Sequence, residues 1–237
     1  MSAGFEELDW RPTPIGTLSL RRRKNPSSGE DIYEIKLGDA FLMSSLFTAA
    51  EIALAELGLA AAPGAEIDVV VGGLGLGYTA EAALQDGRVR SLTVVEALPE
   101  VIEVHQTGLL PLGETLSADP RCRFLEGDFF RLSREARGFD PTNPNRRFHA
   151  ILLDIDHSPR QWLRPDNAAF YTPDGLRRMA ARLHPSGVFA LWSNDPPDED
   201  FQASLSEVFP SSDAHVVSFP NLHQDRPATN TVYVAIA

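Results

Sequence analysis

The segment that most constrains the fold is a short apolar run followed at once by closely spaced glycines. Residues 67–71 (IDVVV) have the length and β-branched composition of a buried strand, and residues 72–77 (GGLGLG) follow directly. Glycine permits tight turns and lets a ligand approach the backbone closely. Residues 78–86 then have a helical composition, and the start of a helix offers unpaired N–H groups. This order of strand, glycines and helix is typical of a nucleotide-binding α/β sheet.

A second strand supports the same interpretation. Residues 91–95 form another apolar run, which ends at Glu96, nineteen residues after Gly77. In nucleotide-binding sheets a carboxylate at this place accepts hydrogen bonds from the ribose hydroxyls. Glycines also follow strands that bind nothing, but the strand, the helix and the acid together favour a binding site. We therefore expect Gly73, Gly75, Gly77 and Glu96 to bind an adenosine-containing molecule.

The rest of the sequence narrows the choice of nucleotide. It contains no GxxxxGK[ST] motif, which argues against ATP, and nothing in it suggests the second catalytic domain or nicotinamide pocket of an NAD enzyme. S-adenosylmethionine (SAM) is the best remaining candidate, because later strand ends also carry acids. Cys122 is the only cysteine, so the chain has neither an internal disulfide nor a cysteine-rich zinc site.

Composition and charge limit the class of protein and its partners. A chain of 237 residues that is 43% hydrophobic suits one α/β domain with a small appendage. It has no apolar run long enough for a membrane helix and no signal-peptide pattern at its start, so we expect a cytoplasmic protein without a membrane partner. The net charge of −12 argues against nucleic acid as a partner and is compatible with a neutral or cationic small substrate.

The first forty residues differ in pattern from the rest. Residues 17–23 and 31–37 alternate in character around a Pro-Ser-Ser-Gly turn, which predicts a β-hairpin. We interpret the basic run 21–24 as part of a solvated strand, because the rest of the chain is acidic. The sequence thus predicts an N-terminal β-hairpin appendage over residues 1–40 and a SAM-binding catalytic domain over residues 41–237.

The second part predicts a helix over 42–59 and then alternating strands and helices. Such alternation is typical of a parallel sheet with right-handed crossovers. We expect a Rossmann-like, seven-stranded α/β sheet with helices on both faces and an antiparallel strand at its edge. The expected strands are 67–71, 91–95, 122–125, 149–153, 187–192, 214–219 and 231–236, and the expected helices are 78–86, 99–107, 173–183 and 199–208.

Acidic residues follow the third and fourth expected strands, and ligands of such sheets bind beyond these strand ends. Asp128 can accept a hydrogen bond from the adenine amine, although an aspartate here also suits a helix cap. Asp154, Asp156 and His157 follow a buried strand, and strand alternation places both aspartates on one side if the strand continues through them. One carboxylate can then hold a cationic amine, while the other, or His157, takes its proton.

Two alternatives remain open for this group. His157 can equally cap the loop, and a metal site formed by all three side chains is the weaker choice because no second ligand cluster appears in the sequence. Three aromatic side chains nearby are candidates for the walls of an acceptor pocket or its lid: Trp162, Tyr171 and Trp192.

The order of these segments resembles the spermidine synthase family over most of the chain. The resemblance is carried by VVVGGLGLG, TVVEALPEVIEV, DPRCRFLEGD, FHAILLDIDHSP and FYTPDGLRRMAARLHPSGVFALW. It implies that Glu96 binds the ribose and Asp128 the adenine. It also implies that Asp154 is the catalytic aspartate, which helps to deprotonate the attacking amine.

The sequence departs from the family pattern at three places. The family's usual turn is GGGDGG, whose Asp holds the amine of decarboxylated SAM, and Gly75 stands at that position. The family's DSSDP is replaced by DIDHSP over residues 154–159, which displaces the second acid. Of the Tyr-His/Gln-Glu motif on the helix before the sheet, only Glu51 remains.

These departures leave several functions open. We expect a cofactor of the SAM type, either SAM or decarboxylated SAM, and alkyl transfer to a small molecule such as an amine, without a structural or catalytic metal. Loss of the amine-binding residues favours methyl transfer over aminopropyl transfer to a diamine. A binding module that retains the cofactor site without turnover is the third possibility. Exposed strand edges of the hairpin can assemble a homodimer.

Overall fold

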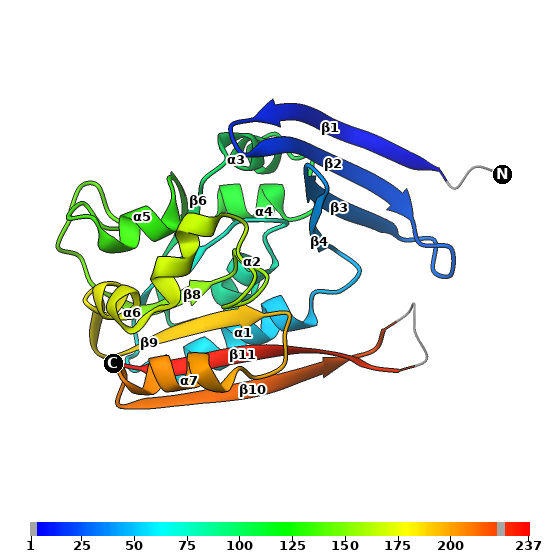
Figure 1. Ribbon diagram of the computed structural model, residues 1–237. Coiled ribbons are helices and arrows are strands. Elements are labelled where there is room, and N and C mark those ends of the chain that lie inside the picture. The colour runs from blue at the N-terminus through cyan, green and yellow to red at the C-terminus, as the bar shows by residue number, and fades with distance from the viewer. Residues whose placement is uncertain (1–3, 222–225) are drawn as a thin grey trace.

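The computed structural model describes residues 4–221 and 226–237 and contains two sheets (Figure 1). The larger sheet has seven strands: β5 (Ile67–Gly72), β6 (Val89–Glu96), β7 (Cys122–Glu126), β8 (Phe148–Leu153), β9 (Leu183–Ser193), β10 (Ser211–Phe219) and β11 (Ala228–Ile236). Their order across the sheet is β10-β11-β9-β8-β5-β6-β7. Strands β5 to β9 are parallel, and β11 pairs antiparallel with β9. The Rossmann-like class and the antiparallel edge are therefore confirmed.

Helices cover both faces of this sheet, as expected. They are α1 (Ala49–Ala61), α2 (Tyr78–Gln85), α3 (Pro99–Gln106), α4 (Gly113–Ala118), α5 (Phe129–Arg134), α6 (Pro173–Ala180) and α7 (Glu199–Ser206), with a 3-10 helix η1 (Pro165–Tyr171). Side chains of β5 alternate between the two cores. Val69 and Val71 pack in the core with α1 to α4, and Val70 packs in the core with α5 to α7.

The connectivity places β5 and β8 at the point where the strand order reverses. From β5 the chain proceeds outward through β6 to β7, and it then returns to β8 on the other side of β5. The carboxyl ends of β5 and β8 are joined by a hydrogen bond of 2.8 Å from the Asp154 N–H to the Gly72 carbonyl. Open α/β sheets bind their ligands beyond such a reversal point.

The N-terminal region is a four-stranded antiparallel sheet formed by β1 (Phe5–Thr13), β2 (Gly16–Lys24), β3 (Asp31–Leu37) and β4 (Ala40–Ser44). The expected hairpin corresponds to β2 and β3, and β1 and β4 extend it on either side. Leu18, Leu20 and Ile35 pack in the same core as α1, so the two sheets share a hydrophobic interior. The division of the chain at residue 40 stays a prediction.

The expected helix over 42–59 is wrong in its first part. Residues 40–44 form β4, which pairs with β3 through Met43 opposite Ile35, and α1 begins only at Ala49. Leucine, methionine and alanine suit a helix locally, but pairing with a neighbouring strand overrides this preference.

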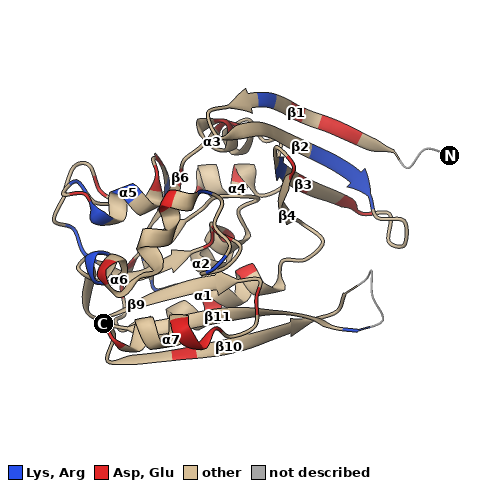
Figure 2. Ribbon diagram, viewed as in Figure 1, with Lys and Arg blue, Asp and Glu red and all other residues tan. Residues whose placement is uncertain are grey.

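The basic run 21–24 lies on β2, as expected, and acidic residues lie on the neighbouring strands β1 and β3 (Figure 2). Arg22 contacts Glu6 at 2.5 Å, and Lys24 contacts Asp31 at 2.8 Å. Within residues 4–221 and 226–237, no helix is long and apolar enough to cross a membrane.

Candidate active site

The glycine turn that follows β5 lies directly against the end of β8. Gly73, Gly75 and Gly77 have φ angles of +96°, +48° and +95°, a region that favours glycine. A Cβ atom on Gly73 would lie 2.1 Å from the Asp154 carbonyl oxygen. Only glycine therefore allows this turn to pass so close to β8.

Glu96, at the end of β6, faces the same turn. One of its carboxylate oxygens accepts a hydrogen bond from the Leu74 N–H at 3.0 Å, and the other accepts one from the Leu98 N–H at 2.9 Å. Burial raises the pKa of this carboxyl above its ordinary value. The backbone N–H groups of residues 74, 75, 97 and 98 all act on this carboxylate and oppose the rise in its pKa. Ribose binding by Glu96 stays a prediction.

Two acids, Glu51 and Asp154, face each other on the α1 side of the sheet. Asp154 accepts a hydrogen bond of 2.7 Å from the Thr79 hydroxyl, which also lies 3.4 Å from the Glu51 backbone carbonyl. Burial raises the pKa of Asp154 to about 6. Burial and the charge of Asp154 raise the pKa of Glu51 to about 8. At neutral pH Asp154 is therefore mostly ionised and Glu51 is mostly protonated, so the pair carries one negative charge.

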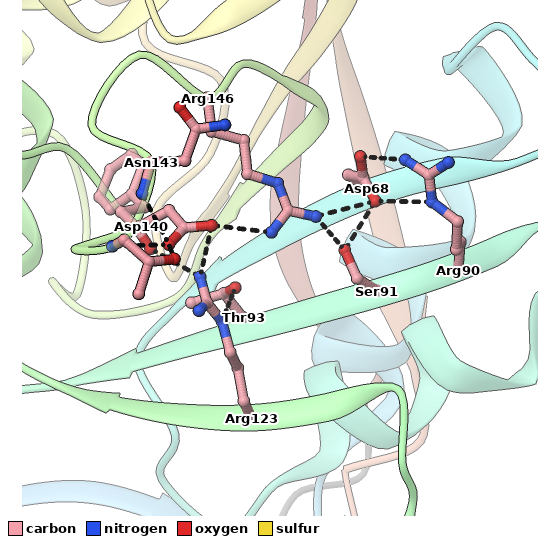
Figure 3. A network of polar contacts seen from close by, with 10 residues as sticks. Asp68, Arg90, Ser91, Thr93, Arg123, Asp140, Asn143 and Arg146 are labelled. Atoms are coloured by element: carbon pink, nitrogen blue, oxygen red, sulfur yellow. Dashed lines mark hydrogen bonds and ion pairs between the residues drawn. The ribbon is translucent and has the colours of Figure 1, made fainter.

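Two other buried acids, Asp68 and Asp140, have arginine partners, and the contrast is informative. Arg146 lies between Asp68 and Asp140, 3.0 Å from each, and Arg90 approaches Asp68 to 2.6 Å (Figure 3). Neither Glu51 nor Asp154 forms an ion pair within the described parts of the chain. A buried charge without a partner is unfavourable unless a ligand supplies the opposite charge. The Glu51–Asp154 pair is thus suited to hold a cation that comes from outside the protein.

Aromatic side chains lie next to this pair. Leu153 of β8 is paired in register with Leu191 of β9, so the residues that follow, Asp154 and Trp192, are neighbours on one face. The indole N–H of Trp192 is buried and has no partner in the described residues. Burial raises the pKa of Tyr78, and the charge of Glu51 contributes to this rise. Tyr78 and Trp192 therefore flank the acids, which suits an acceptor pocket.

Asp156 does not share this site, and the expectation that both aspartates face one pocket is wrong. Its buried carboxylate accepts hydrogen bonds from the Leu163 N–H at 2.7 Å, from the Asn167 amide at 2.9 Å and from the Tyr171 hydroxyl at 2.8 Å. Strand β8 ends at Leu153, so the alternation does not continue to Asp156. Asp156 instead anchors the loop that follows β8. Tyr171 belongs to the core on the α6 side and does not form a lid.

His157 and Asp128 both contact neighbouring elements of the fold. The His157 carbonyl accepts a hydrogen bond of 2.7 Å from the Asn194 N–H, which joins the ends of β8 and β9. Asp128 caps α5 by accepting a hydrogen bond of 2.9 Å from the Arg131 N–H, and its other oxygen lies 3.5 Å from Arg164. The helix-cap alternative for Asp128 is thus realised. Proton transfer by His157 and adenine binding by Asp128 stay predictions.

Reasoning from the residues alone did not identify Glu51 and Thr79 as site residues. Only the family resemblance points to Glu51. In the sequence itself, the one indication is that an acid lies on the apolar face of a helix. Thr79 was a small polar residue in the first turn after the glycines. Among residues 4–221 and 226–237, the structure contains no group of three or more acidic, histidine or cysteine side chains placed to hold a metal ion.

Comparison with known proteins supports the fold assignment. Protein-family models give no match to this chain, and curated protein sequences give none either. A solved spermidine synthase in complex with the transition-state analogue AdoDATO is similar at TM-score 0.74 and 18% identity, over 97% of this chain and 73% of that one. Spermidine synthase from Thermotoga maritima is similar at TM-score 0.73 and 18% identity, over 97% and 72%. A probable spermidine synthase from Corynebacterium glutamicum ATCC 13032 is similar at TM-score 0.63 and 17% identity, over 96% and 79%. The chain therefore has the spermidine synthase fold, as its sequence layout suggested.

Proposed function

We propose that this protein is a transferase that moves an alkyl group from a SAM-type sulfonium to the nitrogen of an amine. The observation that carries the proposal is the Glu51–Asp154 pair, two inward-facing acids with no basic partner in the described residues, next to the glycine turn. A protonated amine supplies the missing positive charge. The glycine turn and Glu96 supply a surface that fits the adenosyl part of the cofactor.

The residues of the pair have different tasks in this scheme. The sulfonium, when bound, supplies an electrophilic carbon and a good leaving group. Asp154 is ionised at neutral pH, so its carboxylate attracts the acceptor ammonium and takes its proton, which frees the nitrogen lone pair for attack. Glu51 is protonated in the free enzyme, and a bound cation favours its ionisation. Thr79 fixes the Asp154 carboxylate through its hydroxyl.

Aminopropyl transfer from decarboxylated SAM is the first candidate reaction. The solved structures most relevant to this proposal are spermidine synthases that share the fold over nearly the whole of this chain. Asp154 occupies the position that the family resemblance gives to the catalytic aspartate. On this basis the acceptor is a small aliphatic amine, such as a diamine.

Methyl transfer from SAM is the second candidate, and one local observation favours it. The family's amine-binding Asp would stand at position 75, but here the sulfur of Met43 would lie only 3.0 Å from a Cβ at this position. The turn thus presents a glycine and a thioether where the family resemblance predicts a carboxylate. Nothing at this position matches the positive charge of an aminopropyl group.

Calorimetry with SAM and with decarboxylated SAM, followed by mass spectrometry of amine products, tests the proposal. Tighter binding of decarboxylated SAM and a product heavier by an aminopropyl group support the first candidate. Tighter binding of SAM and a methylated amine support the second. If both cofactors bind and no amine is modified, the protein is a binding module. If neither cofactor binds, the proposal is wrong.

A further inference from the structure

The peptide between Gly75 and Leu76 is held from two sides by side chains of different elements. The Nε2 atom of His105, on α3, lies 2.9 Å from the Gly75 carbonyl oxygen. The N–H of Leu76 donates to the sulfur of Met43, on β4, at 3.1 Å. In a trans peptide the carbonyl and the following N–H point in opposite directions. The two contacts therefore fix one orientation of this peptide and oppose its reversal.

Packing alone does not account for a histidine at position 105. The side chain is fully buried beside the Phe124 ring, at 6.0 Å between centroids, and its Nδ1 atom has no partner in the described residues. Burial lowers the pKa of this imidazole, so the ring is neutral, and its single N–H is the Nε2 donor to Gly75. An aliphatic side chain would fill the same space without an unpartnered nitrogen. The contact with the glycine turn is what the imidazole adds.

The fixed peptide belongs to the turn that contacts both the expected ribose-binding residue and the acid pair. Directly before this peptide in the chain, the Leu74 N–H is bound by Glu96, the residue expected to hold the ribose. One residue further back, Gly73 lies against Asp154 of the acid pair. The turn at residues 73–76 therefore links the groups proposed to hold the ribose and the acceptor. The part of the cofactor beyond the ribose would contact this segment.

We infer that His105 is a positioning residue that fixes the glycine turn for the part of the cofactor beyond the ribose. The inference rests on the proposed function. A thioether is a weak acceptor, so Met43 alone holds the Leu76 N–H weakly, and the stronger constraint comes from His105. With His105 in place, the Gly75 carbonyl points toward α3. Without His105, the Gly75–Leu76 peptide can flip, so that its carbonyl and N–H exchange directions. The sulfonium and its substituents would then face a different peptide group.

Calorimetric affinities for three ligands test the inference: SAM, decarboxylated SAM and 5′-methylthioadenosine, which lacks the amino-acid-derived tail. In His105→Leu, the affinity for whichever tailed cofactor the native protein prefers should fall about fivefold, the effect of losing one hydrogen bond. The affinity for methylthioadenosine should change by less than about twofold. His105→Gln, which keeps an N–H donor at a similar distance, should retain most of the native affinity for the tailed cofactor. Because the effect depends on the tail and is rescued by glutamine, general loosening of the fold would not produce it.

Two patterns of weakened binding would overturn the inference. One is equal weakening of all three ligands in His105→Leu, and the other is a His105→Gln variant as weak as the leucine variant. If His105→Leu does not fold, His105→Asn replaces it, because the shorter amide does not reach the Gly75 carbonyl. If the native protein binds none of the three ligands, the proposed function itself fails. If the native protein binds the cofactor and the His105 variants bind it with the same affinity, the role of His105 is refuted and the proposed function stands.

Discussion

Replacing Glu51 by glutamine should stabilise this protein, and the gain should grow with pH. The pKa of Glu51 rises from the ordinary value of 4.5 to about 8, because of burial and the neighbouring charge of Asp154. Between these two pH values the native state holds a proton that the unfolded chain has lost, so the free energy of unfolding falls as the pH increases. Glutamine has nearly the same shape and does not titrate. The free energy of unfolding of the Glu51→Gln variant therefore does not fall in this way as the pH increases.

The magnitude follows from the pKa change. One pKa unit corresponds to about 1.4 kcal/mol, so the native protein loses about 3 kcal/mol by pH 7 and about 5 kcal/mol above pH 8. For a chain of this length, 1 kcal/mol moves the melting temperature by about 2–4 °C. We expect Glu51→Gln to melt roughly 6–12 °C above the native protein at pH 7, and close to it at pH 4.5. Asp154 should keep its pKa of about 6, because Glu51 is already neutral when Asp154 titrates.

Melting curves of both proteins from pH 4.5 to pH 9 measure this effect, with Asp140→Asn as the matched control. Asp140 is also a buried acid, but Arg146 and Arg123 lie 3.0 and 3.4 Å away and its pKa is well below the ordinary value. Its charge stabilises the native state above about pH 4, so Asp140→Asn should melt below the native protein at neutral pH. If the difference in melting temperature between Glu51→Gln and the native protein does not change with pH, the reasoning is refuted.

Three further predictions separate the roles of the other acids. Asp154→Asn should lower turnover by ~100-fold or more and leave cofactor affinity nearly unchanged, as measured by kcat and calorimetry, and unchanged turnover would remove its role as the base. Glu96→Ala should weaken cofactor binding by about 1.5–3 kcal/mol in the same calorimetric assay, whereas native affinity would show that the ribose lies elsewhere. Asp156→Asn should lower the free energy of unfolding in urea by about 1–3 kcal/mol, because an amide cannot accept all of its hydrogen bonds, and a large loss of kcat without loss of stability would contradict its structural role.

Local patterns were sufficient to predict the sheet and its glycine turn. Strand β5 is continuously apolar because both its faces are buried, and the glycines after it have positive φ angles that few other residues adopt. Such features depend on neighbours in the sequence. Strand β4 could not be predicted in this way, since its residues favour a helix and only pairing with β3 makes them a strand.

The candidate site was harder to predict because its two acids meet only in the folded chain. Glu51 is on α1 and Asp154 follows β8, and how α1 packs on the sheet decides whether the two carboxyl groups meet. For Asp156 the sequence predicts a contact that the fold does not form. Its position two residues after Asp154 suggested a shared pocket, but the end of β8 at Leu153 sends its carboxylate to the opposite core.

The different surroundings of these aspartates support a functional role for the pair. Asp156 has three hydrogen-bond donors from the segment after β8, two of them on η1, and Asp140 has two arginines within ion-pair distance. The fold thus provides partners where an acid only needs to be buried. For Glu51 and Asp154 the described residues provide no ion pair, only the Thr79 hydroxyl for Asp154 and a backbone N–H for Glu51, and the fold tolerates the loss of stability that their raised pKa values imply. Such a loss at one place, beside the glycine turn, is expected where a ligand brings the missing positive charge.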